Sequence, residues 1–260
     1  MISPKLSVVL LSFIASHDED SVNCRIANHI LDHLDELKET TIVQLAHQCF
    51  VSVSTISRFC RDIGLNDFFE LKELIETHQH TYLAQVYAMD SQTRTKQLLD
   101  HTVQSLHEVV NSVDLAKIDV IAHDIEHYDD VVILGMLKAS TVALNLQNDL
   151  LALGKRTQSK MAFQRQMEYF ENPQLKRLII IFSFTGVYFD YDFPEYFFDQ
   201  KRRTKIVFIT SDPNAIDSDH YDLVLNFKSK QDYASHPFQL QFIASLIALA
   251  YAQRTLNTKT

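Results

Sequence analysis

The spacing of hydrophobic residues changes near the middle of the chain. From residue 1 to about 112 they recur with the spacing of amphipathic helices. From residue 131 onward, short apolar runs rich in β-forming residues alternate with helical stretches. We therefore expect an all-α half followed by an α/β half.

Four runs in the second half predict the strands of a parallel sheet. Each is short, apolar and flanked by polar or turn residues, as expected for strands that are covered on both faces. Helical patterns lie between them at about 139–153, 163–170 and 190–201, and a long one follows at 237–253. This alternation predicts a right-handed doubly wound sheet flanked by helices. The four strand runs are 131–135, 178–182, 205–210 and 223–227.

Residues 41–64 predict two short helices joined by a tight turn. The second helix has a buried stripe of apolar residues, Ser52 as its N-cap and Gly64 as its C-terminal stop. Small polar residues near its start and two arginines suit entry into the major groove of DNA and contacts with phosphates or guanine edges. From this pattern alone, an ordinary pair of packed helices is an equal alternative. The residues predicted to contact DNA are Ser52, Ser54, Thr55, Ser57, Arg58 and Arg61.

The same stretch resembles a known family. Residues 51–64, Val-Ser-x-Ser-Thr-Ile-Ser-Arg-Phe-Cys-Arg-x-Ile-Gly, continue into Phe68-x-Glu70-Leu71-Lys72 and closely resemble the RpiR-type family of bacterial transcriptional regulators. The resemblance implies a small all-helical domain that binds operator DNA as a dimer. One departure is Phe50, which stands at the turn position where many helix-turn-helix units carry glycine.

The resemblance extends over nearly the whole chain. In this family the helix-turn-helix is followed by a sugar isomerase domain, a parallel α/β sandwich that senses phosphosugars. We accordingly predict a DNA-binding domain over 1–80, a helical linker over 81–105, and an effector-binding and oligomerisation domain over 106–260. The implied protein is a homodimer or homotetramer whose partners are operator DNA and a phosphosugar or related metabolite.

Two loops of the second domain depart from the family pattern. The first, residues 135–140, has Leu137 at the place of a glycine and Ala139 at the place of a serine, although the next residues carry hydroxyls. In the second, residues 183–188, the last threonine has become Tyr188. Either the loops still bind a phosphate at the carboxyl edge of the sheet, or the pocket is filled and the domain only dimerises. The predicted ligand residues are Gly135, Ser140, Ser183, Thr185 and Gly186.

Charge limits both proposed binding activities. The chain has a net charge of −9, and residues 1–80 hold six Lys and Arg against twelve Asp and Glu, a net −6. DNA binding therefore has to come from a local face around Arg58 and Arg61, doubled by dimerisation. The aromatic and acidic run 188–198 beside the second loop is expected to cover the pocket or form a subunit contact, and its acids disfavour an anionic ligand.

Other chemistries are less favoured. The sequence has no phosphate-binding P-loop, dinucleotide fingerprint or G-x-S-x-G elbow, and no general base for a sugar-phosphate isomerase can be identified. His123 and His127 lie one helical turn apart without an evident third ligand, so a solvated helix face is preferred to a metal site. We therefore predict no catalytic residues, metal or cofactor.

The expected location is the cytoplasm. No run approaches the length of a membrane span, and the N-terminus lacks a signal-peptide cleavage site. The three cysteines, Cys24, Cys49 and Cys60, form no C-x-x-C pair and are expected to be reduced core residues.

Overall fold

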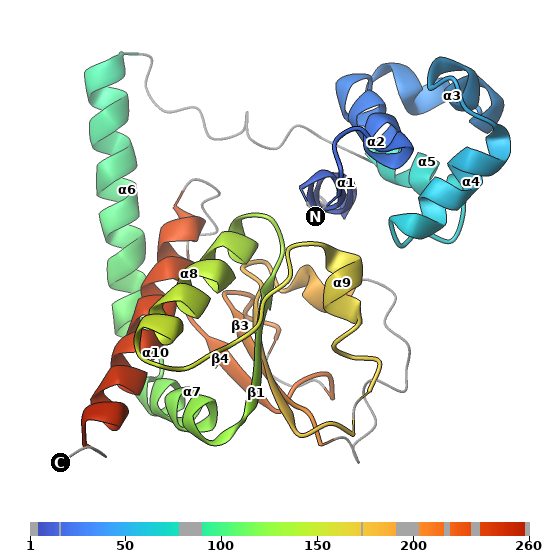
Figure 1. The fold of residues 1–260 in the computed structure, drawn as a ribbon. Helices are drawn as coiled ribbons and strands as arrows, with labels where there is room; N and C mark the ends of the chain where they lie inside the picture. Colours follow the sequence, from blue (N-terminus) through green and yellow to red (C-terminus); the bar gives the residue numbers. More distant parts are fainter. Residues whose placement is uncertain are drawn as a thin grey trace. The chain divides into compact units, whose positions relative to one another are not determined.

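The chain forms two compact units (Figure 1). The first consists of Met1–Ala84 with Met161–Arg165, and the second of Gln85–Lys160 with Gln166–Thr260. The structure, a computed structural model, describes residues 5–15, 17–77, 90–172, 174–190, 203–215, 219–229 and 235–257.

The DNA-binding half predicted from the sequence is all-α, as expected. Its helices enclose a small core in which Ile26, Ile30, Leu45, Ile56 and Phe59 are buried. Asp67 lies just before the last helix, α5 (Phe68–Thr77), and its carboxylate accepts hydrogen bonds from the amides of Phe69 and Glu70 at the start of that helix. The helices are α1 (Lys5–Ile14), α2 (Val22–Asp32), η1 (Glu36–Glu39), α3 (Ile42–Gln48), α4 (Val53–Asp62) and α5 (Phe68–Thr77).

The second half is built on a four-stranded parallel sheet with the order β1-β2-β3-β4. The strands are β1 (Asp130–Gly135), β2 (Arg177–Phe182), β3 (Lys205–Thr210) and β4 (Leu223–Asn226), so each predicted strand is confirmed to within one residue at either end. Strands buried on both faces read as continuous apolar runs, which is why the pattern located them well. Around them lie α6 (Ser91–Ser112), α7 (Leu115–His127), α8 (Lys138–Ala152), α9 (Phe163–Met167), η3 (Val187–Asp190) and α10 (His236–Asn257).

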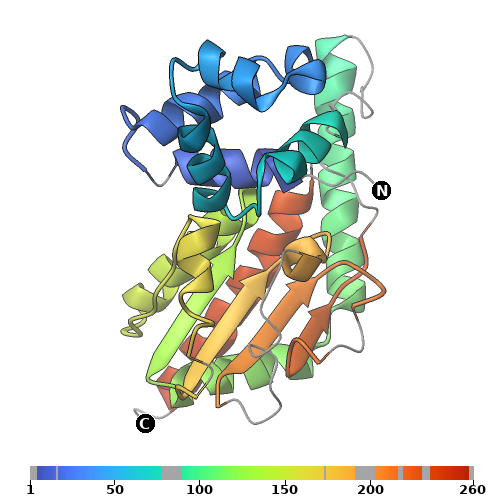
Figure 2. The same cartoon turned by 90° about the vertical axis from the view of Figure 1, so that its right-hand side faces the viewer.

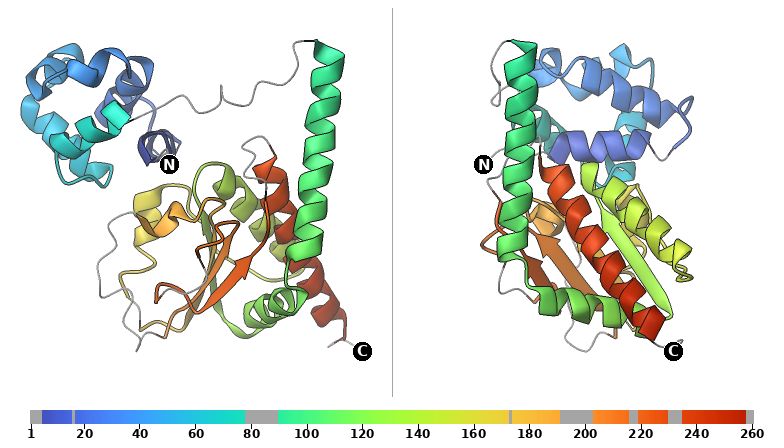
Figure 3. Two further views of the ribbon diagram at one scale, coloured as in Figure 1. Left: turned by 180° about the vertical axis from the view of Figure 1, so that it is seen from behind. Right: turned by 90° about the vertical axis from the view of Figure 1, so that its left-hand side faces the viewer.

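Helices cover one face of this sheet. Alternate strand residues such as Ile133 and Ile180 point toward α7, α8 and α10 and are fully buried there. Figure 3 shows α8 and α10 side by side over the sheet, with α7 running across near one end of α10 and α6 packed against α10. The intervening residues, such as Val132 and Ile179, are equally buried on the opposite face, where η3 lies (Figure 2). The α/β architecture expected from the sequence is therefore present.

An extended segment that was not predicted adds to the sheet beyond β1. The amide of Gln158 donates to the carbonyl of Val131 at 2.9 Å, and the amide of Ile133 donates to the carbonyl of Gln158 at 2.8 Å. The chain thus passes from β1 to this outer segment and then returns to the other side of β1 to form β2. Open α/β sheets bind ligands at the carboxyl ends of the strands where the winding reverses in this way. This reversal places the loops after β1 and β2 at the expected ligand position.

Several helix predictions need correction. Helix α9 ends at Met167 rather than near 170, whereas α10 continues to Asn257. Most of the helix expected at 190–201 lies outside the described residues, and residue 190 belongs to η3. The linker predicted at 81–105 falls partly on α6, which starts at Ser91 and runs beyond it to Ser112, while residues 81–89 lie outside the described ranges.

The cysteines and helix lengths bear on the remaining expectations. Cys24 and Cys60 are buried, but Cys49 is only half-buried because it caps the end of α3, so its assignment to the core was wrong. None of the three forms a disulfide.

Within the described ranges, no helix combines the length and the apolar character needed to cross a lipid bilayer.

Candidate nucleic-acid interface and effector site

The turn between α3 and α4 is built around a left-handed residue. Phe50 has φ of 56°. Its amide donates to the carbonyl of His47 at 3.1 Å, and the amide of Val51 reaches back to the carbonyl of Ala46 at 2.9 Å. This is the bonding of a Schellman ending, which normally uses glycine at the left-handed position. The backbone therefore keeps the glycine conformation although the residue is phenylalanine, whose side chain is 94% exposed.

Three hydroxyl groups gather at the start of α4. Ser52 is the N-cap, since its Oγ accepts a hydrogen bond from the amide of Thr55 at 3.2 Å. The same Oγ lies 2.7 Å from Oγ of Ser54 and 2.8 Å from Oγ1 of Thr55. Short polar side chains at a helix start allow close approach to a phosphate or a base edge, and the helix dipole favours an anion there.

The two faces of α4 separate the core from the predicted contacts. Ile56, Phe59 and Cys60 are fully buried, and burial raises the pKa of the Cys60 thiol to about 12. Arg58 and Arg61 are exposed. The structure thus brings all six predicted DNA contacts onto the start and outer side of one helix, although the Ser57 hydroxyl donates to the carbonyl of Val53 at 3.2 Å. Their contact with DNA stays a prediction.

The loop after β1 is tightly closed. A side chain at Gly135 would meet the backbone of Ala139 at 2.7 Å, so glycine is required there. Leu137, at the position of the missing glycine, has φ of 49°. The hydroxyl of Ser140 is buried and donates to the carbonyl of Leu137 at 2.6 Å, and that of Thr141 donates to the carbonyl of Lys138 at 2.7 Å. Both hydroxyls are therefore engaged within the first turn of α8.

The loop after β2 exposes less than the sequence led us to expect. Ser183 is buried, and its amide donates to the carbonyl of Ile209 at 2.9 Å. Thr185 is exposed. Gly186 has φ of 82°, and a side chain there would lie 2.6 Å from Oδ2 of Asp212. A carboxylate thus packs directly against this loop, which opposes the binding of an anion beside Gly186.

Tyr188 and Gln166 connect the two loops in the interior. Both side chains are fully buried. The hydroxyl of Tyr188 donates to Oε1 of Gln166 at 2.8 Å, and Nε2 of Gln166 donates to the carbonyls of Gly135 at 2.7 Å and Lys160 at 2.8 Å. Only the replacement of the family's threonine signalled this bridge in the sequence, and Gln166 was not identified. The bridge fills space beside both loops.

The five predicted ligand residues lie on two adjacent loops. Gly135 is paired with Phe182 in register, so the loops after β1 and β2 begin side by side. Of the hydroxyl groups, however, those of Ser140 and Ser183 belong to buried residues and only Thr185 is exposed. Their role in ligand binding remains a prediction.

The histidine pair on α7 forms no metal site that the structure describes. The rings of His123 and His127 stack at 4.0 Å on an exposed helix face. Among the described residues, no three His, Cys, Asp or Glu side chains converge as metal ligands would.

Comparison with known proteins identifies the first domain. Residues 14–80 match the helix-turn-helix domain of the rpiR family. No curated protein sequence matches the chain.

Solved structures with the same fold include NanR and an RpiR transcription factor. NanR from Vibrio vulnificus, complexed with ManNAc-6P, is 16% identical with a TM-score of 0.51, over 98% of this chain and 96% of that one. The sugar isomerase domain of an RpiR transcription factor from Sphaerobacter thermophilus is 18% identical with a TM-score of 0.50, over 63% of this chain and 92% of that one.

A third structure, a ligand complex of a protein from Escherichia coli CFT073, is 13% identical with a TM-score of 0.52, over 70% of this chain and 95% of that one. At these identities the likenesses establish the fold. The second half of the chain has the fold of a sugar isomerase domain, and residues 14–80 match the model of the rpiR-family helix-turn-helix domain.

Proposed function

We propose that the chain is a DNA-binding transcriptional regulator whose second domain senses a phosphosugar or a related metabolite. The observation that carries the proposal is α4: a helix with a hydroxyl-rich start and two exposed arginines, within a helix-turn-helix domain of the rpiR family. Such a helix is suited to the major groove, with Arg58 and Arg61 contacting phosphates or guanine. Its place of action would be the cytoplasm.

The charge of the first domain supports an oligomer. With a net charge of −6 over residues 1–80, one domain offers few cations to neutralise DNA phosphates. Two copies joined through their second domains would present two α4 helices to two half-sites, so that the modest affinity of each is combined. A homodimer or homotetramer is therefore part of the proposal.

The effector site of the proposal lies at the loops after β1 and β2. The winding of the sheet reverses there, and the NanR structure with ManNAc-6P shares the fold. The bridge between Tyr188 and Gln166 favours the alternative of a closed domain that only oligomerises. Binding at the loops would require this bridge to rearrange, and such a rearrangement is one way in which a ligand could favour one arrangement of the DNA-binding domains over another.

A regulatory role is preferred to catalysis. No general base is identified at the loops, and a helix-turn-helix domain has no part in isomerase chemistry. A sugar-phosphate isomerase remains the less favoured alternative.

The experiment selects DNA first and then tests the effector. Duplexes bound by the full chain are enriched from a random pool, and the affinity for the selected duplex is measured by fluorescence anisotropy with and without each of a panel of sugar phosphates and amino-sugar phosphates. At least one compound should change the affinity about tenfold, which corresponds to about 1.4 kcal/mol of coupling. The Ser183→Ala, Thr185→Ala variant should bind the DNA but lose the response. The melting temperature of the chain is also measured with each compound. If the chain binds DNA specifically but no compound alters its DNA affinity or its melting temperature, the result would support the alternative of a domain that only oligomerises.

A further inference from the structure

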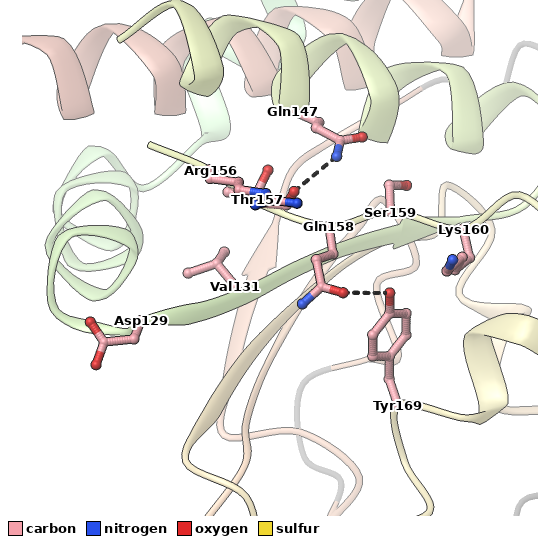
Figure 4. Close-up of a pocket in the computed structure, with 9 residues that line it drawn as sticks. All are labelled: Asp129, Val131, Gln147, Arg156, Thr157, Gln158, Ser159, Lys160 and Tyr169. Carbon is pink, nitrogen blue, oxygen red and sulfur yellow. Dashed lines mark hydrogen bonds between the residues drawn. The ribbon is translucent and has the colours of Figure 1, made fainter. Parts of the chain in front are cut away.

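A hollow lies at the outer edge of the sheet, away from the loops after β1 and β2. It has a volume of about 590 Å³ and is formed around the extended segment that pairs with β1 (Figure 4). Gln147 of α8 and Tyr169 contact this segment from opposite sides in Figure 4. The lining residues are Asp129, Val131, Gln147, Arg156, Thr157, Gln158, Ser159, Lys160 and Tyr169.

The walls of this edge groove are fixed by hydrogen bonds. Nε2 of Gln147 donates to the carbonyl of Thr157 at 2.9 Å. The hydroxyl of Tyr169 donates to Oε1 of Gln158 at 3.2 Å, and Nε2 of the same glutamine donates to Oδ1 of Asp130 at 3.0 Å. The side chains of Gln147, Gln158 and Tyr169 are therefore held in place and define the shape of the groove.

The groove is positively charged although the chain is acidic. Residues 155–160 read Lys-Arg-Thr-Gln-Ser-Lys and contain three cations and no acid, in a chain with a net charge of −9. Asp129 is the one acid of the lining. Partial burial lowers the pKa of the neighbouring Lys155 ammonium, and the negative charge of Asp129 opposes this shift. Within the described ranges, the side chains of Arg156 and Lys160 form no ion pair or hydrogen bond. Both cations are thus available to a ligand.

The chemistry of the lining defines the kind of ligand. Val131 is the single aliphatic residue among the nine, so an apolar molecule would gain little by burial. Arg156, Gln158 and Lys160 alternate along the segment, and all three are exposed and line the groove, whereas Thr157 is buried. Two cations with an amide between them suit an acidic group and the hydroxyls attached to it.

We propose that this edge groove binds a small hydrophilic anion, a phosphorylated or carboxylated polyol, through Arg156 and Lys160. The groove is separate from the loops proposed as the effector site. One link connects them: Nε2 of Gln166 donates to the carbonyls of both Lys160 and Gly135. The anion site does not depend on the proposed regulatory function.

Isothermal titration of the full chain tests this site directly. The probes are glucose 6-phosphate, gluconate, inorganic phosphate and uncharged glucose, used with the wild-type chain and the Arg156→Gln, Lys160→Gln variant. A control, Arg203→Gln, Lys228→Gln, removes the same charge from exposed positions outside the groove. At least one anion should bind wild type and control alike and bind the groove variant at least tenfold more weakly, while glucose should not bind. The phosphate and carboxylate probes distinguish the two kinds of acid.

Three results would overturn the proposal. The first is that no anion binds the wild-type chain. The second is that binding is unchanged in the groove variant and lost in the Ser183→Ala, Thr185→Ala variant, which would place the anion at the loops and leave the regulatory function standing. The third is that the groove substitutions alter only the molecular mass measured by light scattering, which would make the groove a contact between subunits. Circular dichroism of each variant confirms that it is folded.

Discussion

Replacing Phe50 by glycine should stabilise the helix-turn-helix, although it removes a large side chain. The φ of Phe50 is 56°, and a residue with a Cβ loses about 1–2 kcal/mol in this conformation. The side chain is 94% exposed, so its removal sacrifices almost no burial. Glycine is more flexible in the unfolded chain and costs about 0.5–1 kcal/mol in return. The difference predicts a gain of about 0.5–1 kcal/mol.

The same domain offers a variant of opposite sign. Gly64 ends α4 with φ of 85°, and a Cβ there would meet no atom within 4 Å. Gly64→Ala should therefore destabilise by about 1 kcal/mol through backbone strain alone. Phe50→Ala keeps the Cβ and removes the ring, and it should lie within about 0.5 kcal/mol of the wild type.

Amide hydrogen exchange over α3 and α4 measures the change in local stability at each helix. This assay is chosen because a chain of two units need not unfold in a single two-state step. The protection factors of the α3 and α4 amides should be about threefold higher in Phe50→Gly than in Phe50→Ala. In Gly64→Ala these protection factors should be lower than in the wild type. Equal or lower protection of Phe50→Gly would show that the turn gains nothing from glycine and that the argument from φ is wrong.

Three further outcomes are expected. Ser52→Ala removes the N-cap of α4 and should lower the hydrogen-exchange protection of that helix by about 0.5–2 kcal/mol, whereas Ser52→Gly should cost only a few tenths; equal effects would contradict a capping role. Tyr188→Phe removes the hydroxyl that donates to Oε1 of the buried Gln166 and should cost about 0.5–1.5 kcal/mol in urea denaturation, whereas unchanged stability would contradict this hydrogen bond. Burial raises the pKa of the Cys60 thiol from 9.0 to about 12, so the free energy of unfolding should be constant below pH 9 and decline as the pH rises toward 12. The thiol should react with a disulfide reagent at pH 8 only after unfolding, and rapid reaction in the native chain would contradict its burial.

The success of the strand predictions has a physical reason. A strand that is buried on both faces must be apolar throughout, and β1, β2 and β3 each have five consecutive buried residues. The edge segment around Gln158 could not be recognised in this way, because a strand at the margin of the sheet pairs through its backbone while its side chains remain polar.

The binding regions show a similar division. The start and end of α4 were predictable because an N-cap serine and a C-terminal glycine are local signals, and both have the expected geometry. The bridge between Gln166 and Tyr188 joins residues 22 positions apart through the interior; the tyrosine in place of the family's threonine marked one end of it, and nothing in the local pattern indicated Gln166. At Phe50 and Leu137 the residue type does not favour the left-handed backbone, and only the family's glycine at these positions signalled it.

If α4 binds DNA through its exposed arginines, their removal should abolish specific binding. Fluorescence anisotropy of a duplex selected from a random pool compares the wild type with the Arg58→Ala, Arg61→Ala variant, and with Arg25→Ala, Lys38→Ala as a control that removes the same charge outside α4. The α4 variant should lose specific binding and show a weaker salt dependence, whereas the control should keep the specific binding and the salt dependence of the wild type. Both variants should stay folded. Unchanged specific binding by the α4 variant would contradict the account.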